Sequence, residues 1–360
     1  MAKKIRAGII GVGNCFAGLI QGVEYYKKNR NKKIIGLMHE KIGPYGFKDI
    51  EFVSAFDVGA NKIGKTLDKA VFASPNLVRW TKLPKSKVVV RETPILDGVG
   101  IFVENKIKPL KNPTPIEKLE KEIEQELKRT KTEILVNYLP VGSQKATEFW
   151  AEVALKTNCA FVNCLPAFSA SNKNWSAKFK RKRIPIIGDD IKGQIGATIV
   201  HRILAKLCSD RGTTIDKTYQ INVGGNTDFL NMLERTRLQS KKISKTEAVT
   251  SQINKEIPAE KIYIGPSDFI PFLGNTKLAF IRIEGKMFAD IPYSVELRLE
   301  VDDKANSAGV VIDAVRCAKL ALDRKIGGYL PVSSYFMKRP LIQYTDDQAK
   351  KIVEEFIKKR

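Results

Sequence analysis

Along the first half of the chain, short apolar runs alternate with segments whose apolar residues recur every three or four positions. The runs are bounded by turn residues and indicate strands at 5–11, 52–58, 87–90, 132–139, 159–165 and 184–190. Segments with helical spacing lie at 14–28, about 62–72 and 116–129. Strands that alternate with helices predict parallel strand–helix–strand units, and therefore an α/β fold with a doubly wound parallel sheet.

The pattern changes after Gly196. A helical segment at 197–208 is followed by strand-like segments at 219–225, 261–265, 277–288 and 293–303. Because no long helix separates these strands, we expect a mostly antiparallel sheet with a few helices. Helical spacing then returns from Asn306 and again over about 346–359.

Together these patterns predict a discontinuous first domain with a second domain inserted into it. The first domain comprises residues 1–195 together with 305–360, and the inserted α+β domain comprises residues 196–304. The length of 360 residues agrees with two domains, since one hydrophobic core rarely supports so long a chain.

Composition adds a strong positive charge. Lys and Arg total 62 and Asp and Glu total 39, so the formal net charge is +23. Such a charge attracts nucleic acid, a membrane surface or a phosphorylated substrate, and composition alone does not choose among them. The one dense basic run, at 178–183, belongs to no recognised nucleic-acid-binding module, which argues against a nucleic-acid partner. No apolar stretch reaches 18 residues and no signal peptide is visible, so we expect a cytoplasmic protein with no membrane partner.

The chain has few residues suited to metal or cysteine chemistry. Its five cysteines are scattered and form no CxxC pair, so we expect neither disulfides nor a zinc site, and no metal among the cofactors. The only histidines are His39 and His201, which leaves proton chemistry to Lys and Asp.

A glycine motif, GVGNCFAG at residues 11–18, ends the first strand and opens the first helix. Gly11 and Gly13 permit a tight turn that brings backbone N–H groups to a pyrophosphate, with Asn14 and Cys15 at the mouth of the turn. Asp57, at the end of the second strand, is placed to bind an adenosine ribose, although it lies 46 residues after Gly11. The combination predicts NAD binding, while a glycine turn without a ligand is the alternative.

Four lysines and two polar turns are further candidates. Lys241 and Lys245 lie one helical turn apart, where like charges repel unless an anion lies between them. In a chain so rich in lysine, however, solvated surface residues are the simpler interpretation. Asp190 ends a predicted strand in GDDIKGQ, and Asn226 and Asp228 lie in NVGGNTDFLN. Ordinary turn chemistry also explains such residues.

These segments resemble the myo-inositol-1-phosphate synthase (inositol-3-phosphate synthase) family in its shorter bacterial and archaeal form. The similarity runs almost end to end, and the segments that carry it include GVGNCFAGLIQGVEYY, AFDVGANKIGK, NYLPVGSQ, PIIGDDIKGQIGAT, NVGGNTDFLNMLER, SKKISKT and LEVDDKANSAGVVIDAVR. The GDDIK, NVGGN and SKKISKT blocks are the most specific, because other dehydrogenases of the same fold do not carry them.

The resemblance implies an isomerase (intramolecular lyase) that cyclises D-glucose 6-phosphate to 1L-myo-inositol 1-phosphate, also named 1D-myo-inositol 3-phosphate. The implied steps are oxidation at carbon 5 by NAD, enolisation, intramolecular aldol closure and re-reduction. This is the first step of inositol and inositol phospholipid biosynthesis. The implied fold is a discontinuous Rossmann-like domain with an inserted catalytic and oligomerisation domain, usually in a homotetramer.

The resemblance also implies roles for individual residues. It assigns catalysis to Lys241, Lys245, Lys277, Lys338 and Asp303. It assigns cofactor binding to Gly11, Gly13, Asn14, Cys15, Asp57, Pro140, Val141, Ser143, Asp190, Gly193, Asp228 and Lys241. It assigns substrate binding to Asn226, Ser267 and Lys245. We expect Lys277 and Lys338 near the sugar oxygens, with Lys241 and Lys245 nearer the phosphate and nicotinamide. Gly193 departs from the family pattern, since relatives commonly have Ser there.

Two other functions remain open on the sequence. An NAD-dependent dehydrogenase of a phosphorylated sugar or aldehyde would share the fold and the cofactor but would release a reduced or oxidised product. A nucleic-acid-binding protein would account for the charge of +23. Tight DNA binding with a steep salt dependence would support that second function.

Overall fold

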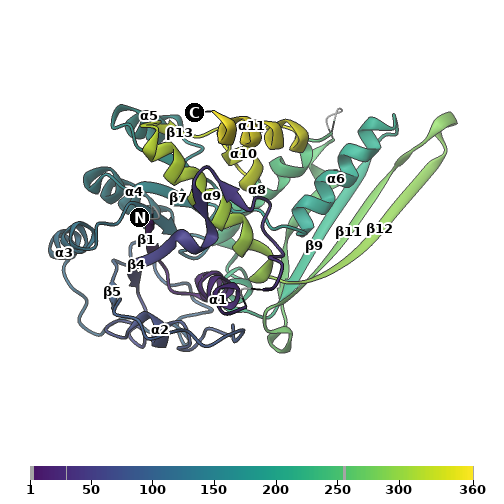
Figure 1. Ribbon diagram of the computed structural model, residues 1–360. Helices are drawn as coiled ribbons and strands as arrows, with labels where there is room; N and C mark the ends of the chain where they lie inside the picture. The colour runs from purple at the N-terminus through teal and green to yellow at the C-terminus, as the bar shows by residue number, and fades with distance from the viewer. Residues whose placement is uncertain (1–3, 30, 254–256, 360) are drawn as a thin grey trace.

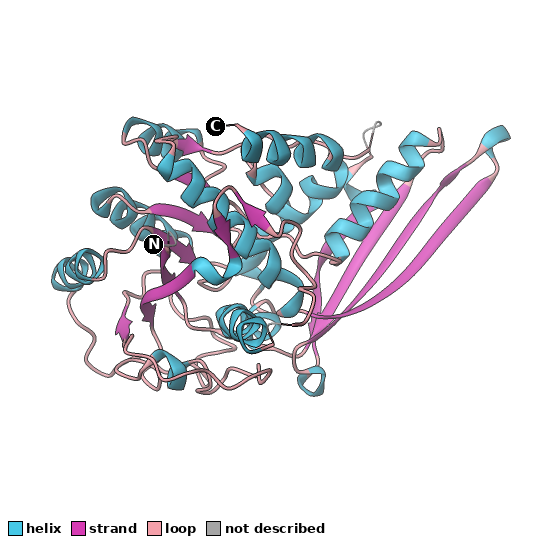
Figure 2. Cartoon of the chain, viewed as in Figure 1, coloured by secondary structure: helices cyan, strands magenta, loops and turns pink. Residues whose placement is uncertain are grey.

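The computed structural model describes residues 4–29, 31–253 and 257–359, except for the side chains of residues 266 and 267. A seven-stranded sheet lies at its centre, in the order β13-β8-β7-β6-β1-β4-β5, and every neighbouring pair is parallel. The strands are β1 (Ile5–Ile10), β4 (Ile50–Asp57), β5 (Val90–Glu92), β6 (Ile134–Asn137), β7 (Ala160–Asn163), β8 (Pro185–Ile187) and β13 (Gly328–Tyr329). The predicted doubly wound parallel sheet is therefore confirmed (Figure 2).

Helices cover both faces of this sheet (Figure 1). One face packs against α1 (Asn14–Lys28) and α9 (Ala305–Asp323), and the other packs against α3 (Ile116–Arg129), α4 (Gln144–Thr157) and α5 (Lys173–Arg181). Strands between two apolar layers are buried on both sides, which is why apolar residues dominate the sequences of most of these strands.

A second sheet has four strands in the order β10-β9-β11-β12. Its strands are β9 (Lys217–Gly224), β10 (Ile262–Phe269), β11 (Thr276–Lys286) and β12 (Pro292–Asp302). Only the β9–β10 pair is parallel, so the predicted mostly antiparallel sheet is confirmed. The helices α6 (Ala197–Asp210) and α8 (Gln239–Thr250) share a small apolar core with this sheet, and α7 (Thr227–Asn231) follows β9.

The β11–β12 hairpin extends away from the rest of the molecule, at the right of Figure 1. Each residue of β12 is exposed or only partly buried. Within the described residues, one edge of β12 has no neighbouring strand. This hairpin is therefore the least covered part of the fold.

The predicted helix at 62–72 is wrong, because α2 covers only Leu67–Ala70. Gly64 has a φ of +81°, a left-handed conformation that a helix does not contain. Just before it, the side chain of Lys62 turns inward and donates to the carbonyl oxygen of Val12 at 2.9 Å. A tertiary contact thus replaces the helix that the periodicity indicates.

The connection between α1 and β4 contains a small hairpin. Its elements are β2 (Lys41–Ile42), β3 (Tyr45–Gly46) and the 3-10 helix η1 (Phe47–Asp49). The buried Arg316 of α9 donates to the backbone oxygens of His39 and Glu40, at 2.7 and 2.9 Å. The connection is thereby fixed to the C-terminal part of the chain.

The C-terminal part adds α10 (Ser333–Phe336) and α11 (Asp346–Lys358), and the short 3-10 helices elsewhere are η2 (Arg235–Leu238), η3 (Ala259–Lys261), η4 (Pro271–Leu273) and η5 (Phe288–Asp290). Although β13 was not predicted, it pairs with β8 and extends the first sheet. The domain boundaries at 195/196 and 304/305 stay a prediction. None of the helices in the described ranges is both long and apolar enough to cross a membrane.

Candidate active site

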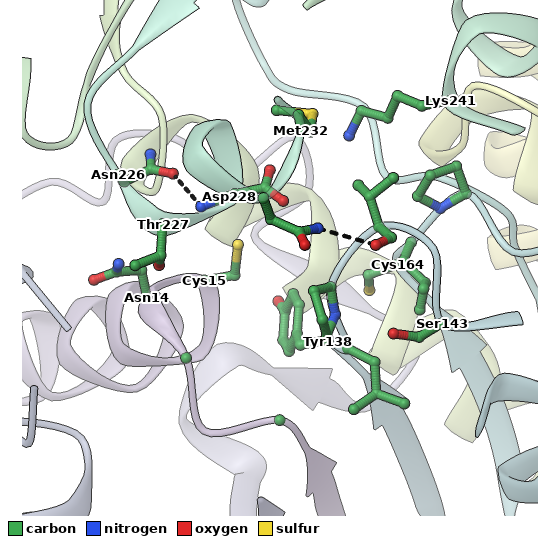
Figure 3. Close-up of a pocket in the computed structure, with 18 of the residues that line it drawn as sticks. Asn14, Cys15, Tyr138, Ser143, Cys164, Asn226, Thr227, Asp228, Met232 and Lys241 are labelled. Carbon is green, nitrogen blue, oxygen red and sulfur yellow. Dashed lines mark hydrogen bonds between the residues drawn. The ribbon is translucent and has the colours of Figure 1, made fainter. Parts of the chain in front are cut away.

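A single pocket at the carboxyl ends of the parallel strands gathers nearly all of the candidate residues (Figure 3). Those that line it are Gly11, Gly13, Asn14, Cys15, Asp57, Pro140, Val141, Ser143, Asp190, Gly193, Asn226, Asp228, Lys241, Lys245, Lys277, Asp303 and Lys338. The remaining candidate is Ser267, whose side chain lies outside the described part of the chain. The roles assigned to these residues stay predictions.

The glycine motif forms a tight turn between β1 and α1. Gly11 has a φ of +90°, and a Cβ there would lie 2.9 Å from the carbonyl oxygen of Tyr138. A Cβ at Gly13 would meet nothing within 4 Å, and the first turn of α1 contains no acidic residue. The positive end of α1 therefore opens onto free space, which suits a bound anion.

Asp57 holds this turn in place. Its Oδ2 accepts a hydrogen bond from the Val12 N–H at 2.8 Å, and its Oδ1 accepts one from the Gly59 N–H at 2.7 Å. Lys62 Nζ lies 3.5 Å from Oδ2 and was not singled out in the sequence. Oδ1 keeps a second lone pair, so ribose binding by Asp57 stays a prediction beside its observed structural role.

Asp190 organises one group of cations. Its Oδ1 lies 2.8 Å from Lys338 Nζ and 3.8 Å from Lys241 Nζ, and its Oδ2 accepts a hydrogen bond from the Ser244 hydroxyl at 2.6 Å. Burial opposes ionisation of this carboxyl, but the charges of Lys338 and Lys241 outweigh it and hold its pKa at about 2. A permanently ionised carboxylate therefore positions two ammonium groups.

Asp303 organises a second group. Its Oδ2 accepts hydrogen bonds from Lys304 Nζ at 2.7 Å and Asn226 Nδ2 at 3.3 Å, while its Oδ1 lies 3.5 Å from Lys277 Nζ. Although burial disfavours the charge, Lys304 and Lys277 hold the pKa of Asp303 well below its usual range. Asn226 also caps α7 by accepting from the Asp228 N–H at 3.0 Å, a bond drawn in Figure 3.

The pocket lysines differ in their readiness to hold a proton. Burial, reinforced by the charges of Lys277 and Lys241, lowers the pKa of Lys245 far below the ordinary value. Burial also lowers the pKa of Lys338, with Asp190 opposing it. The pKa of Lys241 is raised instead, because Asp190 and other pocket carboxylates outweigh its burial. Lys245, whose pKa is far lowered, thus lies in the same pocket as Lys241, whose pKa is raised.

The turn after β6 is held by the last residue of α7. The carbonyl oxygen of Val141 accepts a hydrogen bond from Asn231 Nδ2 at 3.0 Å, and Gly142 has a φ of +91°.

At Gly193, a Cβ would lie 2.9 Å from the side-chain nitrogen Nδ2 of Asn306. Asn306 thus occupies the space beside Gly193, and a serine there would require it to move.

Sequence reasoning missed several polar or charged pocket residues, among them Lys304, Lys62, Asp97 and Tyr138. Three buried polar atoms of the lining have no hydrogen-bond partner among the described residues, namely Asn14 Nδ2, Tyr138 OH and Asn231 Oδ1. Buried polar atoms are rarely left unpaired, so these atoms favour a polar ligand. The sequence signal for Lys304 was its position next to Asp303.

Two residue types that often take part in catalysis have other environments here. His201 is buried, lies 2.8 Å from the Thr218 hydroxyl, and has a pKa lowered by burial to about 4. Burial raises the pKa of Cys15, so its thiol is a poor nucleophile. The described ranges hold no group of three or more His, Cys, Asp or Glu residues arranged to bind a metal ion.

The glycine turn, the parallel sheet and the two lysine–aspartate groups define the class: a Rossmann-like protein whose pocket suits an anionic ligand and proton transfer. Inositol-3-phosphate synthase of Mycobacterium tuberculosis is 50% identical over 359 residues, or 99% of this chain and 96% of the relative. The enzyme of the same name from Corynebacterium glutamicum is 48% identical and covers 98% of both chains. The sequence model of the myo-inositol-1-phosphate synthase family matches residues 196–304. The chain belongs to that family.

Solved structures agree on the fold. A myo-inositol-1-phosphate synthase-related protein from Thermotoga maritima has a TM-score of 0.82 at 24% identity, and covers 98% of both chains. Inositol-3-phosphate synthase from Caenorhabditis elegans has a TM-score of 0.79 at 12% identity, and covers 99% of this chain and 86% of that one.

Proposed function

We propose that this protein cyclises D-glucose 6-phosphate to 1L-myo-inositol 1-phosphate, as an isomerase that uses NAD without net oxidation. The observation that carries the proposal is the pocket itself, where four lysines surround Asp190 and Asp303 beside the glycine turn. The steps of this reaction create or move negative charge on oxygen, above all at the enolate and at the alkoxide of the aldol closure, and preorganised ammonium groups stabilise such charge strongly. The relatives from mycobacteria and Corynebacterium support the same activity.

The residues present fit NAD. The open N-terminus of α1 provides unpaired N–H groups for a pyrophosphate, and Asn14 Nδ2 is a buried donor that lacks a partner among the described residues. Asp57 and the turn at 140–143 line the same side of the site, where they would hold the adenosine half and the cofactor backbone. When bound, NAD would supply a hydride acceptor, and later donor, for carbon 5 of the sugar.

The four lysines would have different roles in the remaining steps of the reaction. The lowered pKa of Lys245 makes it the residue best suited to accept a proton near neutral pH. Lys338 and Lys277, each held by a carboxylate, would stabilise negative charge on the sugar oxygens. Lys241, whose pKa is raised, would remain cationic toward phosphate or nicotinamide.

We further propose a homo-oligomer, a tetramer, built through the β11–β12 hairpin. Phe288 is 96% exposed and Ile291 is 56% exposed at its tip. Large apolar side chains on an uncovered sheet edge commonly mark a protein interface. We assign the protein to the cytoplasm and to the first step of inositol and inositol phospholipid biosynthesis, since its proposed substrate is a charged sugar phosphate that does not cross membranes unaided.

The alternative is an NAD-dependent dehydrogenase of a phosphorylated sugar or aldehyde, and turnover with a limiting amount of NAD separates the two. With one NAD per active site and excess glucose 6-phosphate, the proposed function gives many equivalents of inositol phosphate. A dehydrogenase stops after one equivalent of oxidised sugar, with the nicotinamide left reduced. That result would overturn the proposal.

A further inference from the structure

Lys304 is a buried cation at the mouth of the glycine turn to which the sequence analysis assigned no role. It lies between β12 and α9, is 2% exposed, and lines the pocket. Its Nζ donates to Asp303 Oδ2 at 2.7 Å and lies 3.6 Å from the sulfur of Cys15. Cys15 is in the first turn of α1, so this ammonium reaches the positive end of that helix.

The stem of Lys304 runs along α1 toward its N-terminus. A Cβ at Gly18 would lie 3.1 Å from the Cβ of Lys304, whereas the ammonium group lies beside Cys15, about one helical turn earlier. Gly18 thus leaves room for the stem, and the lysine points along the helix to the place where α1 opens onto the pocket.

Two ammonium groups, two carboxylates and a helix N-terminus meet at this place. Asp303 is shared between the buried Lys304 and the partly buried Lys277, and Asp228 also acts on Lys304. A helix N-terminus carries partial positive charge of its own and ordinarily attracts acidic groups rather than lysine. Nearby anions raise the pKa of Lys304 despite its burial, so the charge is permanent.

We propose that Lys304 is a cofactor-binding residue whose ammonium group binds a phosphate oxygen of the dinucleotide pyrophosphate, together with the N–H groups of α1. This inference rests on the proposed use of NAD. The phosphate of the sugar substrate has the same chemistry, but the contact with Cys15 places Lys304 at the glycine turn. The pyrophosphate is therefore the ligand that the geometry favours.

Calorimetric titration of the protein with NAD, ADP-ribose, adenosine and glucose 6-phosphate tests this assignment without relying on activity. For Lys304→Met we expect the Kd of NAD and ADP-ribose to rise by about 10-fold to 100-fold, with adenosine little changed. Lys304→Arg keeps the charge, and we expect its Kd for NAD within about fivefold of the wild type. Lys206→Gln, at a partly exposed lysine on α6 that pairs with Asp210, removes the same net charge outside the pocket and should bind like the wild type.

The outcomes separate this inference from the proposed function. If Lys304→Met binds NAD as the wild type does, or weakens only glucose 6-phosphate, the assignment of Lys304 is wrong while the use of NAD stands. An equal loss for adenosine and ADP-ribose would also overturn it, because a pyrophosphate contact cannot affect adenosine. If the wild type does not bind NAD at all, the proposed function itself fails. Circular dichroism of Lys304→Arg and Lys304→Met controls for folding.

Discussion

Lys338 Nζ lies 2.8 Å from Asp190 Oδ1, which joins the C-terminal part of the chain to the end of β8 inside the pocket. Asp190 also has Lys241 at 3.8 Å, just as Asp303 has both Lys277 and Lys304. Each of the two carboxylates therefore keeps a cationic partner when one lysine is removed. Catalysis and folding should thus be separable in this pocket.

We expect Lys338→Ala and Lys277→Ala each to abolish turnover, by at least about a thousandfold in kcat, while the fold and NAD binding are retained. Steady-state kinetics, NAD titration and circular dichroism measure the three properties. Lys217→Ala, which breaks an exposed pair with Glu284 outside the pocket, is the control and should leave kcat unchanged. A variant of either pocket lysine that keeps most of its activity would refute its assigned role.

Lys245→Met should remove activity and stabilise the protein. Burial holds the pKa of Lys245 well below the unfolded value of 10.5. On folding, Lys245 therefore either loses its proton or carries its positive charge into the buried pocket. An apolar side chain of similar length removes that cost, which we expect to be about 1–2 kcal/mol at pH 7.

The pH dependence follows from the same shift. Between the folded and unfolded pKa of Lys245 the unfolded state binds more protons, so wild-type stability rises with pH there. The gain in the free energy of unfolding from Lys245→Met should therefore be largest below the folded pKa of Lys245 and should shrink as the pH approaches 10.5. Denaturant unfolding at several pH values measures it, and a uniformly destabilised variant would contradict the expected burial cost.

His39 should stabilise the protein most in mild acid. Its Nδ1 lies 2.6 Å from Asp313 Oδ2 and its Nε2 lies 3.3 Å from Glu354 Oε1. The hydrogen bond to Asp313 raises the pKa of His39 above 6.5, so its contribution is fully present below pH 6.5 and is lost as the pH rises through the folded pKa. His39→Gln should cost about 1–2 kcal/mol at pH 5.5 and much less at pH 9. An equal loss of melting temperature at both pH values would show that the charge plays no part.

Charge at the tip of the hairpin should break the proposed tetramer. Phe288→Asp places a carboxylate where the interface is expected, and we expect a smaller species in analytical ultracentrifugation. Phe272→Asp is a matched control, since Phe272 is 88% exposed but precedes β11 and lies at the other end of that strand. A Phe288→Asp protein with the sedimentation of the wild type would exclude this tip from the interface.

The hydrophobic pattern predicted both sheets well. Whether a strand is buried on one face or on both faces determines which of its positions are apolar, and this pattern can be recognised in the sequence. It failed at 62–72, where Lys62 leaves the helical pattern to contact Val12. That contact spans 50 residues, and local periodicity does not encode it.

The candidate site came from the glycine motif and from resemblance, not from the spacing of the lysines. Lys241, Lys277 and Lys338 come from segments far apart in sequence, and only the fold brings them to Asp190 and Asp303. Lys304 was missed for the same reason, since its contact with Cys15 spans 289 residues. A lysine next to an aspartate in sequence is most simply interpreted as a surface pair.

The central claim is a cyclisation without net redox change, and glucose 6-phosphate deuterated at carbon 5 tests it most directly. The account predicts that inositol phosphate forms with one deuterium retained at the carbon derived from carbon 5, while the absorbance of free reduced nicotinamide stays flat. The contrary result would be deuterium in released reduced nicotinamide, with an oxidised sugar phosphate and no inositol phosphate.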